Sequence, residues 1–146
     1  MLATFILFNK FLSQLANGGY NLGSDTLRFA LTNTAPTAAT DTVFDPLEKH
    51  PPPAAANGYT SGGHAATIDS SEESGGIYTL ACTTDVVITA TAGGIGPFRY
   101  VILYDDTSAT DLLIGYWDYG SSISLNVGET FTIDVTASLL TIAVAA

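Results

Sequence analysis

The residues of this chain with the greatest chemical potential are few and scattered. Its two histidines, His50 and His64, both lie in irregular, loop-like sequence, and its one cysteine is Cys82. Neither histidine has a serine or cysteine nearby in a nucleophile-elbow setting, and no residues mark an oxyanion hole. A single thiol can neither close an intramolecular disulfide nor form a zinc cluster alone, so we expect Cys82 to be buried and inert. The sequence thus predicts no catalytic residues and no enzymatic activity.

A first group of metal-ligand residue types lies between residues 45 and 50. Asp45, Glu48 and His50, with Lys49 between them, lie in an irregular segment. Carboxylates and imidazole bind metal ions, but such side chains in a segment without periodicity are more often solvated. We therefore predict no metal here.

A second acidic group consists of Asp105, Asp106 and Asp111, which flank a short loop between two expected strands. Calcium prefers such oxygen ligands, but the group lacks the spacing of a known calcium loop. A polar turn between strands explains the same residues. No cofactor or metal is predicted at this position.

Two further motifs have an alternative functional interpretation. The run from Gly93 to Pro97 lacks the Lys-Ser/Thr ending of a phosphate-binding loop and enters a strand, so it is interpreted as a turn. Asp118 lies between Trp117 and Tyr119, an arrangement typical of an aromatic-lined sugar site. Aromatic residues at alternating strand positions more often form core or interface, which is the favoured interpretation.

Strand-like segments dominate the elements that would position these residues. Phe98, Tyr100, Ile102 and Tyr104 alternate with Arg99, Val101, Leu103 and Asp105, which predicts a strand with two distinct faces. Similar patterns and turn residues predict further strands, over 25–32, 65–69, 77–82, 86–91, 112–119, 122–127, 130–135 and 139–144. Residues 70–76 are expected to form a polar turn. The fold class is mainly β, a single-domain sandwich or barrel covering residues 1–146.

The N-terminal segment, residues 1–20, leaves two interpretations open. Apolar residues spaced three and four apart over residues 4–16 favour a short helix, which would end at Asn17. Alternatively, residues 2–8 form a strand that a turn of helix follows. Its aromatic residues would anchor the core or reach into a neighbouring subunit.

Residues 35–58 are expected to form a long, extended surface loop. This stretch has no periodicity, and Pro51, Pro52 and Pro53 cannot donate hydrogen bonds to a sheet. Loops of this length are uncommon in compact domains. A clasp over an adjacent subunit and a loop without a function both remain open.

Charge and hydropathy narrow the classes of partner. Four basic residues against fourteen acidic ones give a formal net charge of −10, which disfavours nucleic-acid binding. No apolar run reaches the ~18 residues of a membrane span, and no basic residue precedes the apolar N-terminus as in a signal peptide. We expect a soluble protein made in the cytoplasm. Charged residues make up 12% of the chain, so small neutral side chains should cover much of the surface, as in assembling proteins.

Four phrases of the sequence together resemble a family of small virion structural proteins of tailed bacteriophages. They are FNKFLSQLANGGYNLGSDTLRFALTNTAP, NGYTSGGHAAT, GGIGPFRYVILYDD and LIGYWDYGSSISLNVGETFTIDV, and they span nearly the whole chain. The resemblance implies a structural protein that is present in many copies on the particle.

The role that this resemblance favours is a head decoration, or cement, protein. Such a protein would form a homotrimer on the head surface, bind the major capsid protein and stabilise the shell, with residues 1–20 and the loop around Pro51–Pro53 as candidate contacts. The alternatives are a tail, neck or fibre-associated protein, and a module that recognises host carbohydrate through the aromatic residues of 116–119.

Overall fold

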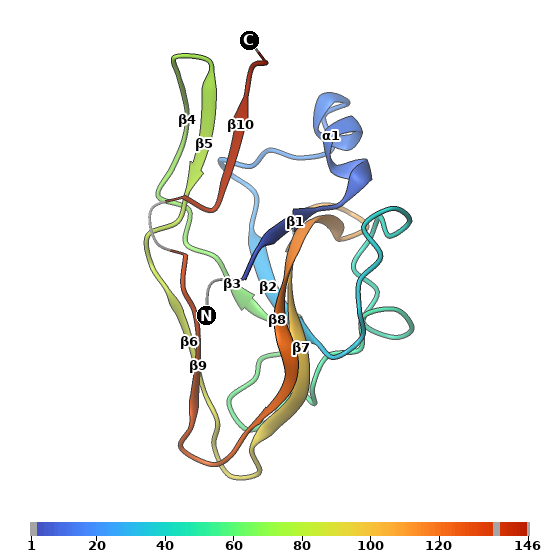
Figure 1. Cartoon of the computed structure of the whole chain (residues 1–146), viewed down its shortest axis with the longest axis vertical. Coiled ribbons are helices and arrows are strands. Elements are labelled where there is room, and N and C mark those ends of the chain that lie inside the picture. Colours follow the sequence, from blue (N-terminus) through green and yellow to red (C-terminus); the bar gives the residue numbers. More distant parts are fainter. Residues whose placement is uncertain (1–2, 136–137, 146) are drawn as a thin grey trace.

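The fold is mainly β, with antiparallel sheets in a sandwich-like arrangement (Figure 1). A computed structural model describes residues 3–135 and 138–145. Its elements are β1 (Phe5–Leu7), α1 (Asn9–Ala16), β2 (Leu27–Thr32), β3 (His64–Ala65), β4 (Ser70–Ser74), β5 (Ile77–Ala81), β6 (Val86–Thr89), β7 (Ile95–Asp105), β8 (Leu112–Leu125), β9 (Thr130–Ile133) and β10 (Leu140–Ala143).

One layer is a five-stranded antiparallel sheet in the order β1-β8-β7-β2-β3. Its centre is the pair of long strands β7 and β8, of 11 and 14 residues. The alternation of apolar residues on β2 and β7 places side chains on both faces of this sheet, and both faces are covered.

The other layer consists of two short ribbons that follow one another. β5 pairs with β10 and β4 in one ribbon, and β6 pairs with β9 in the other. Because β5 leads into β6 and β9 leads into β10, the layer is a long antiparallel pair that is interrupted between its halves (Figure 1).

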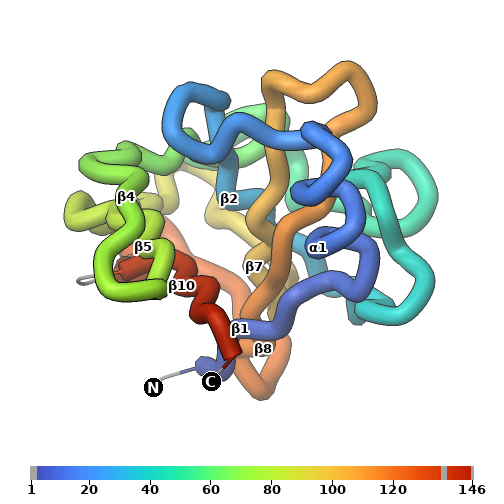
Figure 2. Tube along the Cα trace, turned by 90° about the horizontal axis from the view of Figure 1, so that it is seen from above, coloured from blue at the N-terminus to red at the C-terminus, as the bar shows by residue number. Residues whose placement is uncertain are grey.

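The main core fills the space between the two layers. It contains Phe29 and Leu31 from β2, Leu103 from β7 and Leu80 from β5, all with no exposed surface. A smaller core lies on the other face of the five-stranded sheet, where the segment between β2 and β3 covers it. Figure 2 shows this segment and the second layer on opposite sides of β7.

At the N-terminus, the structure has the second of the two predicted arrangements. β1 is a strand paired with β8, and α1 begins after Phe8 instead of extending over residues 4–16. The extended Phe8 backbone and its N–H bond to the Ile114 carbonyl hold residues 5–8 to the sheet, which prevents an earlier helix start. Gly18, with a φ of 79°, follows the helix end.

Several predictions of strand boundaries were wrong. The strand predicted over 65–69 is the short β3, which ends at Ala65. Residues 70–74 form β4 and not a turn, because all five residues pair with β5 although none of them is apolar. Residues 112–119 and 122–127 are not separate strands, because β8 runs without a break through Gly120, at a φ of 99°. A strand whose side chains are mostly exposed, as those of β4 are, needs no apolar alternation.

The predicted face assignment of Phe98 was also wrong. Phe98 lies in the main core with Val101 and Leu103, while Ile102 and Tyr104 lie in the smaller core on the other face. Register shifts between β7 and β8 lie on either side of Phe98, so β7 does not keep a strict alternation there. The run that was interpreted as a turn, residues 93–97, enters β7 at Ile95.

Candidate functional site

His50 is the most deeply buried titratable side chain of the segment between β2 and β3. Its imidazole has no exposed surface, and its Nε2 lies 3.2 Å from Oδ2 of Asp41. The Asp45 backbone N–H donates to Nδ1 at 3.1 Å, so Nδ1 is unprotonated and Nε2 carries the hydrogen that Asp41 accepts. The ring stacks on Phe44, which in turn stacks on Tyr104 of β7 at 4.4 Å.

Asp41 is the acceptor at the centre of this cluster. Its Oδ2 also accepts the Thr37 N–H at 2.7 Å, and its Oδ1 lies 3.4 Å from Nζ of Lys49. Burial alone would raise the pKa of Asp41, but the bonds from Thr37, His50 and Lys49 outweigh burial and hold this pKa below its ordinary value. The cluster fastens the segment over the smaller core, together with a bond from Thr32 to the Pro51 carbonyl.

The group predicted to be solvated, residues 45–50, is thus divided. His50 is buried, which corrects the prediction, and the Asp45 Oδ1 accepts the N–H groups of Leu47 and Glu48 as a turn. The sequence signal missed Asp41, since it lies nine residues before its partner in irregular sequence. No cluster of three His, Cys, Asp or Glu side chains suited to a metal ion occurs in residues 3–135 and 138–145.

His64, on β3, is not part of that cluster. Its ring lies 5.6 Å from that of Tyr59, and its Nε2 is buried with no hydrogen-bond partner. Burial, followed by the nearby Arg28, lowers the pKa of His64. The two histidines therefore occupy separate structural positions.

The second acidic group, Asp105, Asp106 and Asp111, is also divided. Asp106 forms a 2.8 Å ion pair with Arg28, whereas Asp105 points inward and is fully buried. Asp111 takes a left-handed backbone conformation, with a φ of 53°, in the turn before β8. These side chains do not converge on one point as calcium ligands would.

The aromatic residues of β8 line a hollow of about 630 Å³ between the two layers. We call it the aromatic groove, and its rings are Trp117, Tyr119 and Phe131, with Asp134 also lining it. The sequence signal found the first two rings but not Phe131 or Asp134, which come from the neighbouring layer. Asp118 is excluded from the lining and instead binds Arg99 at 2.8 and 3.0 Å, which lowers its pKa.

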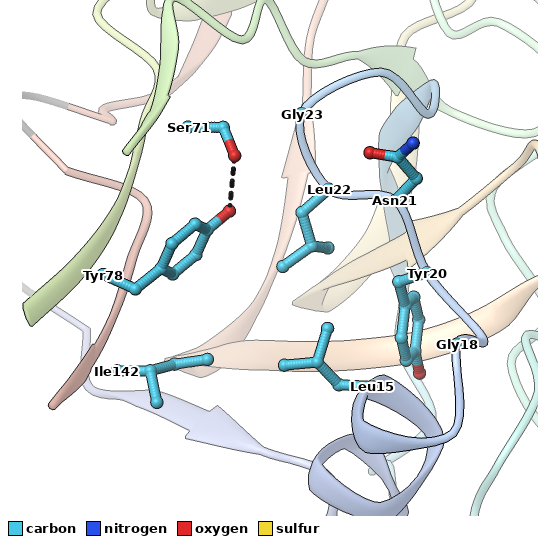
Figure 3. A pocket seen from close by; sticks show the side chains of 9 residues that line it. All are labelled: Leu15, Gly18, Tyr20, Asn21, Leu22, Gly23, Ser71, Tyr78 and Ile142. Atoms are coloured by element: carbon cyan, nitrogen blue, oxygen red, sulfur yellow. Dashed lines mark hydrogen bonds between the residues drawn. The ribbon is translucent and has the colours of Figure 1, made fainter. Parts of the chain in front are cut away.

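A second hollow, of about 620 Å³, lies between α1 and the β5-β10 ribbon. Figure 3 shows Leu15, Leu22 and Ile142 pointing into it, and the hydrogen bond between Ser71 and Tyr78 on one side, at 2.9 Å. We call this hollow the apolar groove. The segment from Gly18 to Gly23 forms the wall opposite β5 (Figure 3).

The outer surface of the second layer is almost free of charge. Cross-strand partners share one face of a sheet, and the residues that alternate with core side chains point away from the core. On this face, which we call the neutral face, Glu72 is the one charged side chain among the strand residues. The others are small or apolar: Ser70, Ser74, Ile77, Thr79, Ala81, Val87, Thr89, Thr130, Thr132, Thr141 and Ala143.

Comparisons with known proteins do not identify the chain. No family model, no curated protein and no solved structure matches it. Among residues 3–135 and 138–145, α1 is the single α-helix, and no helix has the length and apolar character that crossing a membrane requires.

Cys82 is fully buried, and burial raises the pKa of its thiol.

Proposed function

We propose that this protein is a bacteriophage virion structural protein, and that it acts as a capsid decoration protein on the outer surface of the head. The sequence resemblance supports the setting, and the neutral face is the observation that carries the role. In a chain with a net charge of −10, this face lets another protein approach without removing water from many charged groups. A decoration protein needs such a surface and no chemistry.

The partners in this proposal are the major capsid protein and other copies of the same chain, as a homotrimer. Many copies on one shell act together, so each contact contributes even when its own affinity is modest. Neutral threonine, alanine and valine side chains lose little conformational entropy on contact, since they have few rotatable bonds. The neutral face suits repeated, moderate contacts.

The two contact elements predicted from the sequence differ in how much apolar side-chain surface they expose to a partner. Phe8 and Phe11 of the N-terminal segment are buried in the domain's own cores, so their rings are not available to a partner. In the segment between β2 and β3, Leu47 is 89% exposed. We therefore include Leu47 in the proposed contact surface and leave out the aromatic residues of the N-terminal segment.

Imaging of isolated particles by cryo-electron microscopy tests the placement. The expected result is density for this fold on the outer head surface, at positions shared by several capsid subunits. Density found at the neck or tail alone would contradict the decoration role and favour the alternative, a tail, neck or fibre-associated protein. Sedimentation of the free protein tests the homotrimer.

A charge on the neutral face tests the contact surface. Thr89→Glu should lower binding to particles that lack the protein by roughly tenfold, because a buried unpaired carboxylate costs ~1.4 kcal/mol or more. Thr110→Glu, in the exposed β7–β8 loop, is the matched control and should bind as the wild type does. Equal binding by both variants and the wild type would exclude the neutral face as the contact surface.

Carbohydrate recognition is the second candidate, and the aromatic groove favours it. Sugars stack their apolar faces on aromatic rings, and Trp117 and Tyr119 line a groove that Asp134 also lines. Binding on a glycan array, abolished in Tyr119→Ala, would support this function. Tyr119 is chosen because Trp117 also packs on Phe5 at 4.5 Å, and its loss would disturb the core. No binding above the Tyr119→Ala background would remove the candidate.

A further inference from the structure

Asp105 ends β7 in an environment that does not suit a buried carboxylate. The residue has no exposed surface, and its Oδ1 accepts the N–H groups of Thr107 and Ser108 at 2.9 and 3.2 Å. Its Oδ2 is buried and no N–H or O–H group donates to it. A buried carboxylate oxygen without a donor is costly, so this oxygen requires an explanation.

The group that faces Asp105 is another carboxyl. Asp25, in the loop between α1 and β2, lies within hydrogen-bond reach of the Asp105 side chain. The Oδ2 of Asp25 accepts the Asn21 N–H at 2.6 Å. Two carboxylates in contact cannot both be ionised at low cost, whereas one proton between them turns repulsion into a hydrogen bond.

We propose that Asp25 and Asp105 share one proton, and that this acid pair is a pH-sensitive fastening of the α1–β2 loop to the end of β7. When the proton leaves, two negative charges face each other in a buried place and push the loop away. The proposal concerns the fold itself and does not depend on a capsid or a glycan.

The other charged and titratable groups near Asp105 do not donate a hydrogen bond to its Oδ2 in place of the proton. Arg28 of β2 is engaged by Asp106 at 2.8 Å and by the Gly63 carbonyl at 3.2 Å. Asp111 adds another acidic group from the β7–β8 loop, and burial raises its pKa. The Tyr20 hydroxyl donates to the Leu113 carbonyl at 2.7 Å, and burial, followed by Asp105, raises the Tyr20 pKa.

These surroundings set the pH range of the acid pair. Burial, followed by the contact with Asp25, raises the pKa of Asp105 from 3.8 to about 6. The folded state therefore binds this proton more tightly than the unfolded state does. The resulting stabilisation is complete below pH 3.8 and is lost as the pH rises through about 6.

The fastened loop is also a wall of the apolar groove. Asn21 and Gly23 line the groove, and the Asn21 carbonyl accepts the N–H groups of Ser24 and Asp25 at 2.9 and 2.8 Å. Figure 3 shows this loop across the groove from Tyr78. Loss of the shared proton should therefore loosen the groove wall.

Asp105→Asn tests the acid pair, because its amide N–H can donate permanently where the proton does. Between pH 5 and 7.5 the wild type should lose about 5 °C in melting temperature, and amide exchange of residues 20–25, corrected for its intrinsic pH dependence, should accelerate at least threefold. In Asp105→Asn both changes should disappear. The control Glu72→Gln removes one charge from exposed β4 and should follow the wild type. Parallel curves for Asp105→Asn and the wild type would overturn the proposal.

Carboxyl carbon chemical shifts, followed by NMR, provide a readout that loss of a structural contact would not mimic. The wild type should show one aspartate titrating near pH 6, and that step should be absent in both Asp105→Asn and Asp25→Asn. Titration of every aspartate below pH 4.5 would overturn the shared proton. A wild-type melting temperature at pH 7.5 that rises with added Ca²⁺, but not in Asp105→Asn, would also overturn it and assign the pair to a cation.

Discussion

Two buried aspartates of this protein lie in opposite electrostatic situations. Asp41 is 6% exposed and Asp105 is fully buried, so both have lost most of their hydration. The facing groups differ, because Asp41 receives hydrogen bonds from Thr37, His50 and Lys49, whereas one oxygen of Asp105 faces Asp25. The pKa is lowered in the first and raised in the second. The groups that face a carboxyl, and not its depth alone, decide which protonation state the fold stabilises.

The two sites also fasten different parts of the chain to the same sheet. Asp41 and His50 hold the segment between β2 and β3 over Tyr104, on one face of β7. The acid pair of Asp25 and Asp105 holds the α1–β2 loop at the end of the same strand. The Asp41 site needs an ionised carboxylate, whereas the acid pair needs a proton. Acid should therefore loosen the segment between β2 and β3, and alkaline conditions should loosen the α1–β2 loop.

Removal of the imidazole should have the largest effect. His50→Ala leaves a cavity beside Phe44 and leaves the Asp41 carboxylate without one donor, so the free energy of unfolding should fall by about 3 kcal/mol. Urea denaturation at pH 7 measures it. His64→Ala is the matched control and should cost less than half as much, since the His64 Nε2 has no bond to lose. Equal losses would mean that the Asp41 contact adds nothing to stability.

Opposite pH dependences should follow from replacing each aspartate by asparagine. Because the Asp41 pKa is lowered, its contribution is present above the unfolded value of 3.8 and is lost as the pH falls below that value. Asp41→Asn should therefore be less stable than the wild type at pH 7, by ~1 kcal/mol, and approach it in acid. Asp105→Asn should match the wild type in acid and exceed it at pH 7. Melting temperatures between pH 2.5 and 8 measure both, and slopes of the same sign would contradict the comparison.

The smallest effect is expected at the surface pair of Arg99 and Asp118. Its two hydrogen bonds are as short as those of the buried sites, at 2.8 and 3.0 Å, but its side chains are 38% and 35% exposed. Water and salt screen such a pair, so a double-mutant cycle with Arg99→Ala and Asp118→Ala should give a coupling below about 1 kcal/mol. A coupling above 2 kcal/mol would show that burial affects the strength of these charged contacts less than the comparison assumes.

The sequence predicted the mainly β fold because runs rich in apolar and β-branched residues, bounded by turn residues, mark most of its strands. β2, β5 and β6 all lie within segments predicted as strands. β4 was missed because its residues, SSEES, pair on one side only and face water. The face of Phe98 was missed because the register shifts in β7 depend on its pairing with β8, which no local pattern encodes.

The candidate sites were harder to predict than the fold. The pairing of His50 with Asp41 arises from the path of an irregular segment, and the contact between Asp25 and Asp105 joins a loop to a strand end eighty residues later. The sequence predicted only part of the aromatic groove, since Trp117 and Tyr119 are close in sequence while Phe131 comes from the other layer. The spacing of residues along the chain predicts a site when its residues lie on one element. The residues of these sites come from different elements, so spacing does not predict them.

The glutamates of β4 have a consequence for a protein that accumulates at high local concentration. β4 lies at the edge of its ribbon, where unpaired backbone groups invite another copy to add a strand and begin a fibril. Glu72 and Glu73 would then lie about 5 Å from the same residues, or near them, on each added strand. This like-charge repulsion disfavours amyloid-type growth along this edge, so the chain can be crowded without adding strands to β4.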